Sequence, residues 1–244
     1  MADTTATKKV SKSESGHAKN VANLGVMISA VNSFGTAYNP AVVTLTLTSL
    51  KTLKTSLDAL LAKVAAAEAP YKTAVNKRQE AFEGMSALST RVLNALAVSG
   101  SDREIKDAKG MVKNIRGGGK LKAEDAGEAA KTRSTSRMSF DNRLSNFKAL
   151  VALLGGIPAY KPNEADLKIL SLNKYLDSLP ALSTAVNNTA DALSKARIER
   201  DKLLYAASTG AVALSLKVKK YVKSVYGATS PEYKRIAKIE LKNK

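Results

Sequence analysis

The fold is decided by two similar stretches of sequence, Tyr38-Asn39-Pro40-Ala41-Val42-Val43-Thr44-Leu45 and Tyr160-Lys161-Pro162-Asn163-Glu164-Ala165-Asp166-Leu167. Subtracting 38 from 160 gives an offset of 122 residues, and this offset also pairs similar residues further along the chain. Self-similarity at a fixed offset is typical of a duplicated structural unit. The sequence therefore predicts two halves that share one helical plan. The further pairs are Leu47 with Ile169, Ser49 with Ser171, Leu50 with Leu172, Ser56 with Ser178, Leu57 with Leu179, Ala59 with Ala181 and Arg78 with Arg200.

The segment that follows Pro40 has two interpretations. From Val42 to Thr48, apolar residues and threonines alternate, and this pattern on its own predicts a strand. The matching segment of the second half opens with Pro162-Asn163-Glu164-Ala165-Asp166, which is typical of the first turn of a helix. Because duplicated segments should share one conformation, we predict helix in both places.

Each half is predicted to contain the same elements in the same order. A first helix covers residues 21–36 or 142–154, and a turn with the pattern Tyr-x-Pro follows it. A second helix begins after the proline, and its apolar residues recur every three or four positions in the first half. A third helical stretch covers 71–98 or 192–226, and short helices at 102–115 and 231–239 end the halves. Pro70 either starts the third helix or kinks one long helix, and the sequence leaves both possibilities open.

The composition favours an all-α class. Among 244 residues, aromatic side chains make up 5%, Trp is absent and 14 residues are Gly, which is typical of long helices packed through aliphatic side chains. We predict an elongated helical bundle built from two duplicated antiparallel helical units. Its expected parts are a disordered N-terminal arm (1–19), a first repeat unit (20–115), a basic connector that contains glycines (116–138), and a second repeat unit with a basic tail (139–244).

The chain is strongly basic, with 39 Lys+Arg against 21 Asp+Glu and a formal net charge of +18. Such an excess attracts polyanions. From Lys195 to Lys244 we count thirteen basic and four acidic residues, interleaved with tyrosines whose rings can stack on nucleic-acid bases. The alternative is a solvated helix face whose tyrosines pack on the bundle. The candidate nucleic-acid-binding residues are Arg116, Lys120, Lys122, Lys217, Lys220, Tyr221, Lys223, Lys234, Arg235 and Lys238.

Few residues are suited to catalysis or metal binding. The chain has no Cys and one His, which removes thiolate chemistry and cysteine zinc sites and disfavours a hydroxyl–histidine pair. His17 falls in the predicted arm, where we expect an unstructured polar residue. Acidic residues near Arg78 and Arg200 have the spacing of exposed helix-surface ion pairs. The run from Gly117 to Lys120 lacks the Ser/Thr and the preceding strand of a phosphate-binding loop. We therefore expect no catalytic residue, metal or cofactor.

The chain carries a resemblance to other sequences that spans most of its length and is clearest in three stretches of the second half. They are Tyr160-Lys161-Pro162-Asn163-Glu164-Ala165-Asp166-Leu167-Lys168, Ala196-Arg197-Ile198-Glu199-Arg200-Asp201-Lys202-Leu203-Leu204-Tyr205 and Val222-Lys223-Ser224-Val225-Tyr226-Gly227-Ala228-Thr229-Ser230-Pro231-Glu232-Tyr233-Lys234. On these residues the chain resembles a family of uncharacterised helical proteins of Bacteroidota bacteria. The first half departs from it by having Ala41-Val42-Val43 after its proline. The resemblance implies no particular activity, ligand or catalytic residue.

These observations together predict a non-enzymatic helical scaffold whose basic surfaces contact polyanions, with nucleic acid first among them, without sequence specificity. The alternative is a structural protein whose helices pack against copies of itself or against a protein partner. An enzyme ranks third, because Asp, Glu, Lys, Tyr and Ser suffice for some reactions. The first twenty residues lack the apolar segment of a secretory signal, and no apolar stretch approaches the about 18 residues of a membrane span. We therefore expect a cytoplasmic protein without a membrane span.

Overall fold

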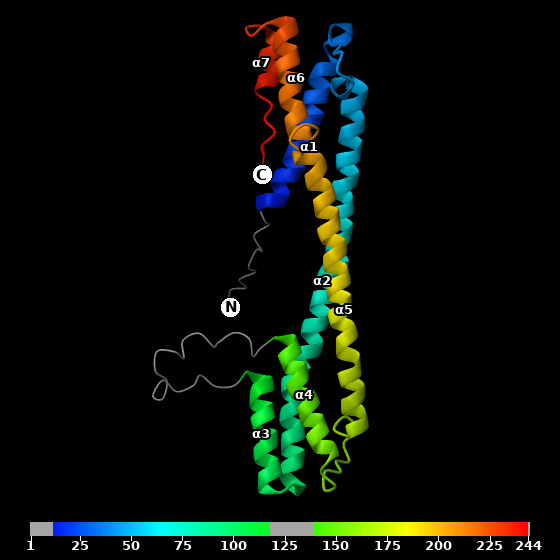
Figure 1. Cartoon of the computed structure of the whole chain (residues 1–244), viewed down its shortest axis with the longest axis vertical. Coiled ribbons are helices and arrows are strands. Elements are labelled where there is room, and N and C mark those ends of the chain that lie inside the picture. Colours follow the sequence, from blue (N-terminus) through cyan, green and yellow to red (C-terminus); the bar gives the residue numbers. More distant parts are fainter. Residues whose placement is uncertain (1–11, 118–138, 244) are drawn as a thin grey trace, which may run out of the picture. The chain divides into compact units, whose positions relative to one another are not determined.

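The computed structural model describes residues 12–117 and 139–243, which form seven α-helices and two short 3₁₀ helices and contain no strand (Figure 1). The predicted all-α class is therefore confirmed. The α-helices are α1 (Lys12–Asn32), α2 (Leu47–Ser99), α3 (Asp102–Arg116), α4 (Phe140–Gly155), α5 (Ile169–Tyr205), α6 (Ala211–Tyr226) and α7 (Pro231–Ala237), and the 3₁₀ helices are Gly35–Ala37 and Val43–Leu45. Within these residues, no helix combines the length and the apolar character that a bilayer span requires.

The segments after the two Tyr-x-Pro motifs are tight turns, so the prediction that their first residues are α-helical is wrong. Residues 163–168 form a turn, and α5 begins only at Ile169. In the first half, a 3₁₀ helix (Val43–Leu45) precedes α2. The cause is the same in both places, because a buried tyrosine hydroxyl donates to a main-chain carbonyl of the turn. Tyr38 donates to Leu45 O at 2.7 Å, and Tyr160 donates to Leu167 O at 2.9 Å.

The long helices begin and end differently from the prediction. α2 continues through Pro70 without a break, so the two helices considered for the first half are one helix of 53 residues. The predicted helix over 192–226 is wrong, because a turn separates α5 from α6 at residues 206–210. Gly210 explains this turn. A Cβ atom at that position would clash with the main-chain nitrogen of Ala206, at 2.5 Å. Glycine has no Cβ atom and is therefore the residue that fits here.

α1 starts earlier than predicted. Residues 12–19 belong to this helix, so a disordered arm over 1–19 is wrong for that part, and residues 1–11 lie outside the described residues. His17 is buried, with 2% of its surface exposed. It precedes Val21 and Leu24 at helical spacing, and both of these are buried as well. The buried face of α1 therefore extends one turn further towards the N-terminus than its apolar residues indicate.

The described chain forms two compact units that do not coincide with the two sequence halves. Unit 1 combines Met1–Ala69 with Asp191–Lys244, and unit 2 is Pro70–Ala190. Each unit therefore contains the beginning of one predicted half and the end of the other. This follows from α2 and α5, because each of these helices runs without interruption from one unit into the other.

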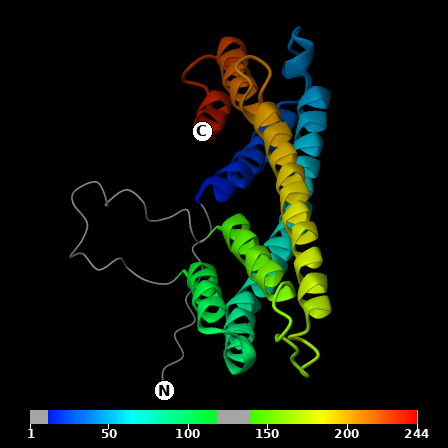
Figure 2. The same ribbon diagram turned by 60° about the horizontal axis from the view of Figure 1, so that its bottom comes forward.

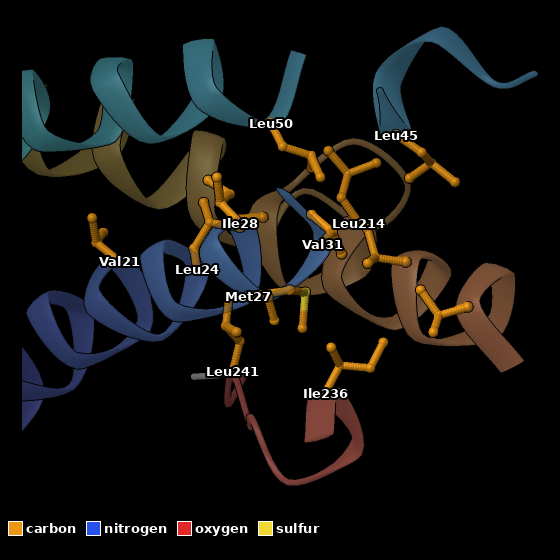
Figure 3. Close-up of a cluster of buried hydrophobic side chains, with 14 of the residues drawn as sticks. Val21, Leu24, Met27, Ile28, Val31, Leu45, Leu50, Leu214, Ile236 and Leu241 are labelled. Atoms are coloured by element: carbon orange, nitrogen blue, oxygen red, sulfur yellow. The ribbon is translucent and has the colours of Figure 1, made fainter. Parts of the chain in front are cut away.

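The core of unit 1 is built by α1, the first part of α2, and the chain from the end of α5 to the C-terminal tail. Figure 3 shows side chains of α1, α2, α6, α7 and the tail converging on one another. The residues labelled there are Val21, Leu24, Met27, Ile28, Val31, Leu45, Leu50, Leu214, Ile236 and Leu241.

The core of unit 2 is built by the second part of α2, by α3 and α4, and by the first part of α5. α3 and α4 lie side by side (Figures 1 and 2). Arg143 of α4 contacts the ring of Phe82 and donates to its carbonyl oxygen. The buried residues include Phe82, Met85, Val92, Leu96, Ala108, Val112, Ile115, Phe147, Leu150, Val151, Leu154, Leu172 and Leu179.

Buried positions of the two sequence halves correspond in register. At an offset of 122, Leu45, Leu50, Leu57 and Val64 pair with Leu167, Leu172, Leu179 and Val186, and all eight are buried. In α1 and α4 the offset becomes 123, and the buried pairs are Leu24 with Phe147, Met27 with Leu150, Ile28 with Val151 and Val31 with Leu154. The two sequence halves therefore bury matching positions, and their duplication stays a prediction.

Candidate polyanion-binding surfaces

α3 presents a continuous basic surface in unit 2. Its start is fixed by a capping box. Ser101 accepts from the main-chain nitrogen of Glu104, while the Glu104 carboxylate accepts from Ser101 N at 2.8 Å. Its end is fixed by Gly117, whose φ of 71° is the left-handed conformation that glycine adopts without strain. The helix is therefore well defined along its whole length.

Four cations follow one flank of this helix at spacings of three and four residues, and we call them the α3 stripe: Lys106, Lys109, Lys113 and Arg116. All four side chains are exposed, and none makes a hydrogen bond or ion pair with another described residue. At about 100° per residue, Asp107 projects from the opposite flank to Lys109. The positive charge of α3 is therefore concentrated on one side of the helix. The acidic residue nearest to the α3 stripe is Asp102, in the first turn.

The α3 stripe borders a groove of about 510 Å³ between α3 and α2. Leu93 and Val112 form its apolar wall. Gly110 lies in the middle of the stripe, and no atom lies within 4 Å of where its Cβ would be. The missing side chain keeps the groove open between Lys109 and Lys113. The sequence prediction included only Arg116 from this surface, although the other three cations have a helical spacing visible in the sequence.

The second basic surface lies on α6 and α7 in unit 1. α6 contains four lysines and no acidic residue. Lys217, Lys220 and Lys223 are exposed on the side of α6 opposite to buried Val218 and Val222, and we call them the α6 face. Three further predicted residues, Lys234, Arg235 and Lys238, are exposed on α7 and just after it.

Several of these side chains also hold the local structure. Lys217 donates to Ser208 O at 2.9 Å, and Arg235 donates to Ser33 Oγ at 3.0 Å. The ammonium group of Lys223 lies 5.7 Å from the centroid of the Tyr233 ring. Lys220 makes no side-chain contact of these kinds with a described residue. The α6 face is thus partly engaged within the protein, whereas the α3 stripe is not.

The tyrosines of this region are packed rather than free to stack on bases. Tyr221 meets the ring of Tyr38 edge-on at 5.3 Å, and its hydroxyl accepts from Asn39 N at 3.1 Å. Tyr226 packs against Phe34, and Tyr233 lies against the core. The alternative interpretation from the sequence, tyrosines packed on the bundle, therefore describes them, and Tyr221 is not placed as a stacking platform.

The predicted connector contributes one described residue to these surfaces. Arg116 is the last residue of α3, and Lys120 and Lys122 lie outside the described residues. Both acidic residues near Arg200 make ion pairs, but Arg200 is buried, so the expectation of an exposed ion pair is wrong for this arginine. Glu199 pairs with Lys63 at 2.6 Å on the surface, and Asp201 pairs with Arg200. The described residues hold no cluster of three His, Asp or Glu suited to a metal ion.

A buried polar cluster around His17 was missed in the sequence. His17 Nδ1 lies 2.6 Å from the hydroxyl of Tyr205, and Nε2 lies 3.9 Å from Asp201 Oδ1. Asn20 also donates to this hydroxyl. The partners of His17 come from the end of α5, and nothing near His17 in the sequence indicates them. The expectation of an unstructured His17 is therefore wrong.

The fold and these surfaces define an all-α protein with two compact helical units and concentrated exposed positive charge. Comparisons of the chain with protein-family models, curated proteins and solved structures found no match. The resemblance to the Bacteroidota family stays a prediction.

Proposed function

We propose that the protein is a non-enzymatic helical scaffold that binds polyanions through exposed basic helix surfaces, with nucleic acid as the main ligand, bound without sequence specificity. The observation that carries this proposal is the α3 stripe, in which four unpaired cations follow one flank of a capped helix. An acidic neighbour three or four positions away can balance an exposed helix cation. Asp102 stands four positions before Lys106, whereas Lys109, Lys113 and Arg116 have no acidic residue at either spacing.

The dimensions of the α3 stripe suit a nucleic-acid backbone. From Lys106 to Arg116 the helix advances ten residues, which is about 15 Å at 1.5 Å per residue. One strand of a duplex presents about four phosphates over that length, at 3.4 Å each. Lysine side chains reach phosphates as flexible point charges, and contacts to phosphates carry no sequence information. The chemistry of the α3 stripe therefore favours binding that is independent of sequence.

The test is binding to fluorescently labelled RNA and DNA, single-stranded and duplex, measured by anisotropy between about 50 and 200 mM salt. The affinity should fall steeply with salt, because each neutralised phosphate releases counterions. The variant Lys106→Ala/Lys109→Ala/Lys113→Ala should weaken binding and lower the slope of log K against log salt by about 2 to 3, at about 0.7–0.9 per lost contact.

A matched control removes the same charge elsewhere in unit 2. Lys77, Lys148 and Lys174 are exposed on α2, α4 and α5, and the triple Ala variant should keep most of the affinity and slope. Circular dichroism checks that both variants fold. If nothing binds even at the lowest salt, or if the control loses as much affinity as the stripe variant, the proposal is wrong. The variant Lys217→Ala/Lys220→Ala/Lys223→Ala measures what the α6 face adds.

A further inference from the structure

A cavity in unit 1 lies between α1, the end of α5 and the C-terminal tail, and its volume is about 430 Å³. Small-molecule sites commonly measure about 300–1,000 Å³. It belongs to neither the α3 stripe nor the α6 face, and it involves the only histidine of the chain. It therefore calls for an explanation of its own.

The floor of this cavity is polar and buried. His17 and Tyr205 meet there through a hydrogen bond of 2.6 Å, and Asn20 is buried beside them. Asp201, whose Oδ1 atom lies 3.9 Å from His17 Nε2, accepts two hydrogen bonds from the fully buried Arg200, at 2.9 and 2.8 Å. Burying so many polar groups costs stability compared with apolar side chains of similar volume. Such clusters in a cavity are candidates for a functional site.

The matched place in unit 2 has an aromatic side chain where unit 1 has His17. The offset of 123 that aligns the buried faces of α1 and α4 pairs His17 with Phe140, and Arg200 pairs with Arg78 at an offset of 122. Phe140 packs on Phe82 with a centroid distance of 4.8 Å, and the Arg78 guanidinium lies 4.2 Å from its ring. In unit 2, the residue matched to His17 is therefore an aromatic ring that packs against its neighbours.

The C-terminal tail is held in place to form one wall of the cavity. The Asn20 amide donates to Lys242 O at 2.8 Å and accepts from Lys242 N at 2.9 Å, while Asn23 donates to Glu240 O at 2.6 Å. Leu241 points into the core between these contacts. Since side chains alternate along an extended segment, Glu240 and Lys242 both face the cavity.

The rim of the cavity is positively charged. Lys19, Lys238 and Lys242 line it together with a single carboxylate, that of Glu240. Three cations against one carboxylate give the rim a net charge of +2. A phosphate monoester carries about −1.5 to −2 at neutral pH, so its charge matches that of the rim more closely than a single carboxylate does.

We propose that this cavity binds a small phosphate monoester. The lysines of the rim neutralise the phosphate, and the polar groups of the floor, His17, Asn20 and Tyr205, orient the organic part of the ligand. The volume is larger than a bare phosphate needs, so an organic group accompanies it. This inference goes beyond the proposed polyanion binding, and of the cavity residues only Lys238 is also a candidate for that binding.

The single histidine supplies a direct readout. In protein without an affinity tag, the imidazole of His17 gives one set of NMR signals, which can be followed while ligands are added at constant ionic strength and pH. The probes are glycerol 3-phosphate, ribose 5-phosphate and adenosine monophosphate, with ribose and gluconate as neutral and carboxylate controls. At least one phosphate monoester should shift the His17 signals saturably. Ribose should give no saturable shift, and gluconate should bind at least about tenfold more weakly.

Variants place the binding in the cavity. Lys238→Ala/Lys242→Ala should raise the Kd of the bound monoester at least about tenfold, whereas Lys220→Ala/Lys234→Ala, which removes the same charge outside the cavity, should leave it unchanged. The triple Ala variant of the α3 stripe should also leave it unchanged, which separates this inference from the proposed function. The inference is overturned if no monoester gives a saturable shift up to about 10 mM, if gluconate binds as well, or if the two lysine pairs behave alike.

Discussion

At the scale of single residues, the two Tyr-x-Pro motifs act through one hydrogen bond. Tyr38 and Tyr160 are both buried, and each hydroxyl donates to the carbonyl oxygen seven residues further along the chain. This bond holds the turn that precedes a long helix in each half. The motif is therefore a structural device of the fold, and its repetition reflects two equivalent turns.

We predict that Tyr38→Phe and Tyr160→Phe each lower the free energy of unfolding by about 1–3 kcal/mol, because each leaves a carbonyl of the turn without its partner. The two losses should be similar, since the geometry is the same. Urea denaturation measures both. Tyr71→Phe is the control, because no hydrogen bond of its hydroxyl to a described residue is found. A loss at either motif no larger than that of the control would count against this role.

The same two tyrosines predict a dependence of stability on alkaline pH. Burial, with a smaller contribution from Tyr221, raises the pKa of Tyr38 to about 12. Burial, followed by the negative charges of Glu164 and Asp166, raises the pKa of Tyr160 to about 12. Because these values lie above the usual 10, the stabilisation from both groups is complete below pH 10 and is lost as the pH rises through about 12.

Unfolding free energies measured from pH 8 to pH 12 should therefore fall above pH 10 in the natural protein. The variant Tyr38→Phe/Tyr160→Phe should have a shallower fall, since two of the groups that must ionise are gone. Equal slopes in the two proteins would show that burial of these hydroxyls does not govern the alkaline transition.

At the scale of elements, the start of α3 links stability to the proposed binding surface. Ser101 caps this helix, and its main-chain and side-chain hydrogen bonds hold the pKa of Glu104 below its usual value. A carboxyl group whose pKa is lowered in the folded protein stabilises it at pH values above the group's usual pKa. This stabilisation is lost as the pH falls from the usual pKa through the lowered one. Ser139 caps α4 in the same way but has no carboxylate partner in the capping box.

We predict that Ser101→Ala and Ser139→Ala each cost about 0.5–2 kcal/mol of stability at neutral pH. Only the loss from Ser101→Ala should shrink as the pH falls through the acidic range, because Glu104 is protonated there even in the natural protein. Denaturation at pH 7 and pH 3 makes the comparison. If Ser139→Ala shows the same dependence on pH, the Glu104 contact is not its cause.

The elements that the sequence predicted well are those whose signals are local. The spacing of Leu50, Leu57 and Val64 marked the buried face of α2, and α3 and α7 lie close to the predicted short helices. The turn at residues 206–210 was missed, although Gly210 is a signal for it. Pro70 could not be resolved from the sequence, because an exposed proline can be tolerated when the helix packs on both sides of it.

The candidate sites likewise divide into residues with a local sequence signal and residues brought together by long-range contacts. Lys106, Lys109 and Lys113 lie in a helix that was predicted, so their alignment with Arg116 can be read from the sequence. The groove beside them depends on Leu93 of another helix. The His17 cluster depends on Tyr205, which lies 188 positions away. Contacts over such distances in the chain leave no local pattern, and only the packed structure brings them together.

At the scale of the whole molecule, both cores depend on both sequence halves. The core of unit 1 joins Leu24 and Leu50 of the first half to Leu214 and Ile236 of the second. The core of unit 2 joins Phe82 and other residues of the first half to the second half in the same manner. The similarity of the halves made two separate repeat units the natural prediction, yet the compact units combine the halves. Neither half by itself contains a complete core.

We predict that residues 1–117 and residues 139–244, produced separately, are each largely unfolded or self-associated, and that mixing or co-expressing them restores one folded complex. The reason is that each fragment exposes the apolar faces that the other covers, and burial of those faces is the main contribution to stability. Circular dichroism and light scattering of each fragment alone and of the mixture test this, with the intact chain as the reference. A fragment that unfolds cooperatively as a monomer would show that one half suffices to form a core. Restoration of the intact chain's helical signal only in the mixture would instead show that the two halves complete each other's cores.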